Sequence, residues 1–147
     1  MARPEVPDTS VLLDALRLPA RWPALMASLQ TGRIWLSAVV VAELHAGTRS
    51  REDAAILDRI VAAMSRVERL LVPDAADWGR TGRLLARRTR LEGALRPRDH
   101  LADVLIVVSA ARLRGEVVTL NLRHFEAWAH LGRAAGLDVV VRLPTSL

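Results

Sequence analysis

The 147-residue sequence contains no cysteine, no lysine and no tyrosine. Without cysteine, the protein cannot form disulfides, a thiolate nucleophile or a cysteine-ligated zinc site. Without lysine, it cannot form a Schiff base or use a lysine ammonium group to hold a phosphoryl group. These absences exclude several classes of enzyme and leave carboxylates, hydroxyls, histidines and arginines as the groups available for chemistry.

Aromatic residues and long apolar runs are also scarce. The four tryptophans and one phenylalanine provide little for a platform on which bases stack. We expect the tryptophans in the core, namely Trp22, Trp35, Trp78 and Trp128. The longest apolar runs, LSAVVVAEL and VLIVVSAA, are too short to span a bilayer as helices, and the first ten residues lack the apolar core of a signal peptide. The sequence therefore predicts a soluble, cytoplasmic protein with no membrane partner.

What the sequence does contain is arginine. All 21 basic residues are arginines, against 16 acidic residues, so the formal net charge is +5. Arginine binds phosphates and carboxylates through its planar fork of donors, and a polyanion or an acidic protein would both suit this charge. The length is typical of one domain, and the 51% hydrophobic residues are enough for a substantial core.

Short apolar strands alternate with helical segments along the chain. Strands are predicted at 33–36, 69–73, 116–121 and 137–143, and a further short strand near the N-terminus. Helices are predicted at 37–47, 52–66, 74–91 and 97–115. This alternation indicates an α/β fold with a parallel sheet covered on both faces. Ligands of such folds bind at the carboxyl ends of the strands, where Asp8 and the residues after VVT would lie.

Asp103 lies in LADVLIVVSAA, which is apolar on every face of a helix and is therefore predicted to be buried. An ionised aspartate inside such a helix is unfavourable unless it is paired or binds a metal ion. Asp99 lies one helical turn earlier on the same face. The alternative is that both are first-turn carboxylates stabilised by the helix dipole, and this alternative is weaker for Asp103, which lies deeper in the helix.

Two further carboxylates have apolar neighbours. Glu43 is the one charge in AVVVAEL, and the alternative for it is an ion pair with Arg33 or Arg49. Asp8 precedes two hydroxyl residues and an apolar run, a pattern that is also typical of a helix N-cap. Three buried carboxylates without a lysine would repel one another unless cations lie between them. Hard oxygen ligands favour Mg²⁺ or Mn²⁺, so Asp8, Glu43 and Asp103 predict a site for one of these ions.

The ordered segments VPDTSVLLDAL, LSAVVVAELHAGTR, ADVLIVVSAARLRGEVVTLNLRHFE and GLDVVV resemble the PIN-domain proteins of the VapC toxin type. Each motif alone is weak, but the ordered set is specific and extends over nearly the whole chain. The resemblance implies one three-layer α/β/α PIN domain over residues 1–147, with a central parallel sheet. It also implies a metal-dependent endoribonuclease that uses Mg²⁺ or Mn²⁺, with Asp8, Glu43 and Asp103 as catalytic and metal-binding residues.

One segment departs from the family. VapC-type proteins often carry a fourth carboxylate after the VVT strand, whereas this chain reads VVTLNLRHF, with Asn121 and His124 and no acid. We expect Asn121 to bind a metal ion through its amide oxygen. We also expect a second metal site to bind its ion more weakly, because one negative charge is missing. The hydroxyls expected to support the site are those of Thr9, Ser10 and Thr119. Surface positions are the default for the histidines: His45, His100, His124 and His130.

Arginines recur at three- and four-residue steps in the helix after Trp78. Arg80, Arg83, Arg87 and Arg90 form one stripe on a helix surface. A stripe of this kind can contact the phosphates of an RNA backbone. The alternative, which the sequence favours slightly, is an ordinary solvated face.

The resemblance also implies partners. A VapB-type antitoxin would wrap the protein and block the acidic pocket, RNA would be the substrate, and the chain would form a homodimer. Two other functions compete with this one. A catalytically weak PIN domain that binds RNA or protein stays open because the fourth carboxylate is missing. A phosphotransfer protein with Asp8 as its nucleophile is disfavoured, because such proteins use an essential lysine.

Overall fold

A sheet of five short strands lies in the middle of the computed structural model, which describes residues 2–145 apart from the side chains of Pro19 and Trp22. The strands are β1 (Glu5–Pro7), β2 (Leu36–Ser37), β3 (Leu70–Leu71), β4 (Glu116–Val118) and β5 (Val140–Arg142). The helices are α1 (Thr9–Arg17), α2 (Trp22–Gln30), α3 (Ala38–Ala46), α4 (Arg51–Arg66), α5 (Ala75–Glu92), α6 (Pro97–Arg112) and α7 (Leu122–Ala134), and a 3₁₀ turn, η1, covers Pro19–Arg21.

All pairings in the sheet are parallel. Strands β1, β4 and β5 form one ladder in that order, and β2 pairs with β3. The two parts are joined where the Glu5 N–H donates to the Arg33 carbonyl at 2.7 Å and the Trp35 N–H donates to the Glu5 carbonyl at 2.8 Å. The resulting strand order is β3-β2-β1-β4-β5, with β1 central. The predicted α/β/α fold with a central parallel sheet is confirmed.

Local signals fix the helix ends. Ser37 caps α3 by accepting hydrogen bonds from the N–H groups of Val39 and Val40, and Gly47 ends the helix, as predicted. Asp74 caps α5 in a reciprocal pair with Asp77, and Gly93 ends α5 with a φ of 73°, a left-handed conformation that glycine adopts without steric cost.

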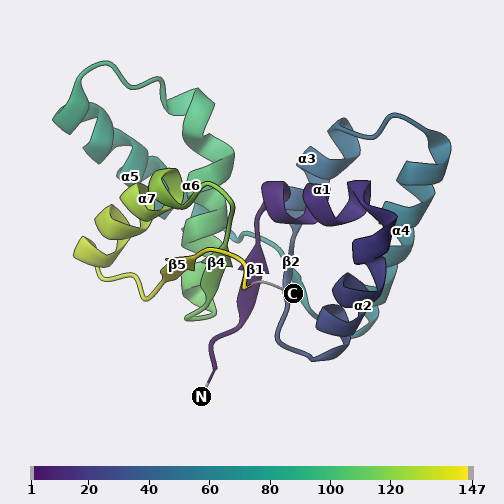
Figure 1. Ribbon diagram of the computed structural model, residues 1–147. Coiled ribbons are helices and arrows are strands. Elements are labelled where there is room, and N and C mark those ends of the chain that lie inside the picture. Colours follow the sequence, from purple (N-terminus) through teal and green to yellow (C-terminus); the bar gives the residue numbers. More distant parts are fainter. Residues whose placement is uncertain (1, 146–147) are drawn as a thin grey trace.

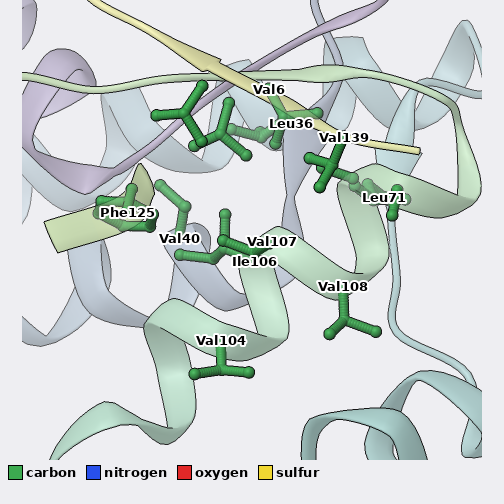
Figure 2. Close-up of a cluster of buried hydrophobic side chains, with 14 of the residues drawn as sticks. Val6, Leu36, Val40, Leu71, Val104, Ile106, Val107, Val108, Phe125 and Val139 are labelled. Carbon is green, nitrogen blue, oxygen red and sulfur yellow. The ribbon is translucent and has the colours of Figure 1, made fainter. Parts of the chain in front are cut away.

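Helix α6 packs against the strands through its buried residues 104–111. Figure 2 shows Val6, Leu36 and Val139 gathered opposite Ile106 and Val107 of this helix. Because the helix is covered on several sides, nearly every residue of this segment is apolar. This packing holds the first turns of α6 in a fixed position at the edge of the sheet.

The tryptophans differ in their burial. Trp128 is fully buried and Trp35 is partly buried against the core, as predicted. Trp78 is half exposed, so the prediction of a core position for it is wrong. The side of α5 that carries Trp78 is only partly covered by the rest of the described chain. The prediction for Trp22 concerns a side chain outside the described part.

Figure 1 shows α5, α6 and α7 beside β4 and β5, and α1 to α4 beside β2. Strand β1 lies between these two groups of helices, and its carboxyl end leads into α1. Among residues 2–145, no helix is both long enough and apolar enough to cross a bilayer.

Candidate active site

Asp8 follows the last residue of the central strand β1 and is almost fully buried. Its Oδ1 accepts a hydrogen bond of 2.6 Å from the Ser10 hydroxyl and a longer one, 3.3 Å, from the Val11 N–H, and its Oδ2 accepts one of 2.8 Å from the Thr119 hydroxyl. Asp8 is therefore the N-cap of α1 and also a member of a polar cluster. The N-cap alternative for Asp8 is confirmed, and its role as a metal ligand stays a prediction.

Residues that follow two neighbouring strands supply the hydroxyls around Asp8. Thr119 directly follows β4, is fully buried, and accepts a 2.9 Å hydrogen bond from the Asn121 N–H while donating to Asp8. Ser10, in the first turn of α1, accepts a 3.2 Å hydrogen bond from the Leu120 N–H. The carboxyl ends of β1 and β4 are in this way held together by side-chain contacts.

Glu43 comes from the second turn of α3, and its Oε1 accepts a 2.7 Å hydrogen bond from the Thr9 hydroxyl. Partial desolvation raises the pKa of Glu43 above its ordinary value of 4.5, the hydrogen bond from Thr9 opposes this shift, and the negative charges of Asp103 and Asp8 add to it. The three predicted acids therefore lie near enough to interact electrostatically. The ion pair of Glu43 with Arg33 is not formed, because Arg33 contacts Glu5 at 3.1 Å.

The acids are less buried than predicted. Only Asp8 is buried, whereas the Asp103 side chain is 30% exposed and Glu43 is exposed at the rim. The reason is that Asp103 lies one residue before the fully buried part of α6, on the turn that faces the edge of the sheet. Exposure at the rim is what a carboxylate needs if it is to reach a ligand.

Sequence reasoning missed the partner of Asp103. His124, in the first turn of α7, lies with its Nε2 2.8 Å from Asp103 Oδ2, so a surface position as the default for this histidine is wrong. The His124 ring contacts His100 at 5.5 Å between centroids, and His100 contacts Trp128 at 5.6 Å. His100 is itself partly buried. The position of His124 just after the VVT strand was the available signal.

Asn121 begins α7 at the same edge of the sheet. Its side chain is exposed and makes no capping hydrogen bond to the helix. Its backbone joins the cluster through the hydrogen bond from its N–H to the Thr119 hydroxyl, and the role of its side chain as a metal ligand stays a prediction.

The acids suit a divalent ion by their chemistry. Carboxylate oxygens are hard ligands, and the repulsion that raises the pKa of Glu43 is the kind that a cation relieves. As they stand, however, no three histidine, aspartate or glutamate side chains within the described part of the chain are arranged to hold a metal ion. The carboxylate oxygens are therefore of the type that binds a divalent ion. The exposed side chains of Glu43 and Asp103 would have to reorient before they could bind the same ion as Asp8.

The predicted arginine stripe lies elsewhere. Arg80, Arg83 and Arg87 are exposed along α5 and contact none of the three acids. They line a separate hollow between α5 and the segment that follows α7.

Residues 6–131 match the PIN domain family. The chain belongs to the PIN domain family. The resemblance found in the sequence is confirmed, and PIN domains are generally nucleases. No curated protein matches the sequence.

Solved structures that share this fold include three complexes with DNA. A chain of FitAB bound to an IR36 DNA fragment is 19% identical with a TM-score of 0.64, and the match covers 97% of this chain and 96% of that one. A chain of VapBC2 from Rickettsia felis, bound to a DNA fragment from its promoter, is 18% identical (TM-score 0.63; 96% and 98% covered). A chain of DNA-bound VapBC from Salmonella typhimurium is 23% identical (TM-score 0.63; 97% and 98% covered).

Proposed function

We propose that this PIN domain is a metal-dependent endoribonuclease and the toxin of a VapBC-type toxin–antitoxin pair. The observation that carries the proposal is that three acids from separate elements, Asp8 after β1, Glu43 on α3 and Asp103 on α6, lie near enough to one another at the carboxyl edge of the sheet for the charges of Asp8 and Asp103 to act on Glu43. Carboxylates that lie close together repel one another, and a bound cation would offset this repulsion. A cluster of acids at the carboxyl edge of a parallel sheet is therefore a candidate metal site.

Asp8, Asp103 and Glu43 would hold Mg²⁺ or Mn²⁺, with the Asn121 amide oxygen as a neutral ligand. The ion supplies Lewis acidity, which lowers the pKa of a water molecule and offsets the charge of the phosphoryl oxygens. Asp8 is the rigid member of the set, because three donors fix its carboxylate. His124 orients Asp103 through their hydrogen bond.

Glu43 is suited to orient the attacking water and to take its proton. Its exposure at the rim of the site leaves its carboxylate accessible to water. No side chain need act as a nucleophile, since the Ser10 hydroxyl is occupied with Asp8 and Leu120. Attack by water at phosphorus, in line with the P–O3′ bond, would form the new P–O bond as the P–O3′ bond breaks, and the leaving 3′ oxygen would take up a proton, so that the products would be a 5′-phosphate and a 3′-hydroxyl.

A VapB-type antitoxin is the proposed partner. The supporting fact is that the fold matches chains taken from FitAB and VapBC complexes over nearly their whole length. The antitoxin would insert a basic side chain into the acidic site. We further propose that the chain acts as a homodimer in the cytoplasm.

Incubation of the purified protein with a 5′-labelled RNA tests the proposed activity. Cleavage should require Mg²⁺ or Mn²⁺, stop in EDTA, leave a 3′-hydroxyl on the labelled fragment, and be lost in Asp8→Asn while the circular dichroism spectrum is kept. Cleavage that continues unchanged in EDTA, or in Asp8→Asn, would show that the acids are not the active site.

A second candidate is a PIN domain that binds RNA or protein with little catalysis. The observation in its favour is that no three metal-binding side chains in residues 2–145 are already arranged around one point. RNA that binds to the protein but stays intact at millimolar Mn²⁺ would favour this candidate over the nuclease.

A further inference from the structure

Helix α5 exposes four arginines along one side of a hollow of about 390 Å³. The arginines are Arg80, Arg83, Arg87 and Arg90. Leu84 and Ala86 of the same helix line the hollow with them, and Ala135 and Leu137, between α7 and β5, close its other side. The floor is therefore aliphatic and the rim is cationic.

No acidic side chain lines this hollow to balance the charge. Arg80 has one distant acid contact, 4.0 Å from the buried Asp77. In the part of the chain that the structure describes, Arg83, Arg87 and Arg90 form no ion pair.

Arg88 on the same helix differs from these four arginines, because other side chains of the protein hold its guanidinium in place. It forms an ion pair with Glu92 at 3.0 Å and its guanidinium lies 4.4 Å above the Trp128 ring. The four arginines of the hollow lack such anchors, so their charge is available to an anion from outside.

The spacing of the arginines suits an extended anion with repeated charges. Steps of three and four residues along a helix separate neighbours by roughly 5 Å, and the whole stripe spans about 15 Å. Planar guanidinium groups in such a row can each bind a phosphate through two donors. A single small anion would leave most of the row unused.

The stripe also leads toward the acids. Helices α5 and α6 are joined by the short segment 93–96, and Asp77 near the beginning of α5 contacts Arg112 at the end of α6, so the two helices run in roughly opposite directions. The end of α5 that carries Arg90 therefore lies beside the beginning of α6, the helix that presents Asp103. Arg96 and Arg98, both exposed, lie at that junction.

We propose that the arginine hollow on α5 binds the sugar-phosphate backbone of a single-stranded polynucleotide, outside the cleavage site. The inference rests on the proposed function, because the strand bound here is the one whose phosphodiester reaches the acids. The aliphatic floor can pack against ribose. The lining has no aromatic ring on which a base could stack and no amide side chain to read one, so binding is independent of base sequence.

Fluorescence anisotropy with a labelled 20-nucleotide oligouridylate in EDTA, over a range of salt concentrations, tests this proposal. Each phosphate that is no longer neutralised by an arginine makes the slope of log affinity against log salt less steep by about 0.7. Arg83→Gln/Arg90→Gln should therefore make the slope less steep by about 1.4 and weaken binding at low salt. The matched control is Arg59→Gln/Arg66→Gln, an exposed pair on α4 with the same seven-residue spacing, which should leave the slope nearly unchanged.

The outcomes separate this inference from the nuclease proposal, because the binding is measured without a metal ion. An unchanged slope for Arg83→Gln/Arg90→Gln, or an equal change in the α4 control, overturns the inference even if the protein cleaves RNA. If Arg83→Gln/Arg90→Gln makes the salt slope less steep but the parent protein never cleaves RNA, the proposal for the arginine hollow is supported and the nuclease proposal is refuted. If a labelled polyglutamate peptide of equal charge binds as tightly and depends on Arg83 and Arg90 as strongly, the hollow is a site for an acidic protein segment instead.

Discussion

Replacing Thr119 with valine should lower the free energy of unfolding by about 3 kcal/mol. Thr119 is fully buried, and its hydroxyl donates to Asp8 Oδ2 at 2.8 Å and accepts from the Asn121 N–H at 2.9 Å. Valine keeps the shape of threonine, so the change removes only the hydroxyl. A hydrogen bond to a charged acceptor contributes about 1.5–3 kcal/mol, and a buried group left without its partner costs about 1–3 kcal/mol. Asp8 keeps its other donors, Ser10 and Val11, which holds the loss near the lower end of the combined range.

Urea unfolding in EDTA, followed by tryptophan fluorescence, measures this loss. Thr119→Ser is the matched control: it keeps the hydroxyl and deletes a methyl group, at a cost of about 0.8 kcal/mol. The valine variant should therefore be about 2 kcal/mol less stable than the serine variant. The slope of the unfolding free energy against urea concentration should be the same for both variants. Equal stabilities for the two variants would refute the idea that the Thr119 hydroxyl holds Asp8.

Two further predictions concern the acidic site itself. Because the pKa of Glu43 is raised in the folded protein, the folded state binds this proton more tightly than the unfolded state, and the contribution of Glu43 to stability falls as the pH rises above 4.5. In EDTA, the stability of Glu43→Gln relative to the parent should therefore rise between about pH 4 and pH 7, and a constant difference would contradict this. Mn²⁺ should support cleavage better than Mg²⁺ at equal concentration, because Asn121 offers only a neutral oxygen where an acid is missing and Mg²⁺ demands near-ideal octahedral geometry. Asn121→Asp should narrow that gap, and an unaltered Mg²⁺ requirement in this variant would mean that Asn121 does not face the metal.

The sheet and most helix ends follow from local signals in the sequence. Ser37 and Gly47 bound α3, and Asp74 and Gly93 bound α5, because a cap and a left-handed glycine act within a few residues of the chain. The apolar strands predict the parallel sheet because both faces of it are covered. Positions at the ends of strands then bring Asp8 and Thr119 to one edge, although they are 111 residues apart.

Burial and long-range pairing could not be predicted in the same way. Asp77 is fully buried because Arg112 on α6 contacts it at 2.9 Å, yet nothing near Asp77 in the sequence marks it as different from exposed acids. The pair of Asp103 and His124 forms only because α6 and α7 pack side by side. Trp78 is exposed because α5 turns that side outward. The burial of Asp77, the pairing of Asp103 with His124 and the exposure of Trp78 all depend on which face of a helix packs against a neighbouring helix. The hydrophobic pattern of a single helix predicts that face only approximately.

The rate of RNA cleavage by Asp103→Asn, compared with that of Asp99→Asn in the same buffer with Mn²⁺, tests the central claim most directly. Both substitutions remove one negative charge from the first half of α6, but Asp99 is exposed in the first turn and Asp103 contacts His124 and interacts with Glu43. We predict that Asp103→Asn loses more than the roughly 10–100-fold caused by removing an outer partner of a metal ligand, while Asp99→Asn stays close to the parent. Equal rates for the two variants would contradict the assignment of Asp103 to the active site.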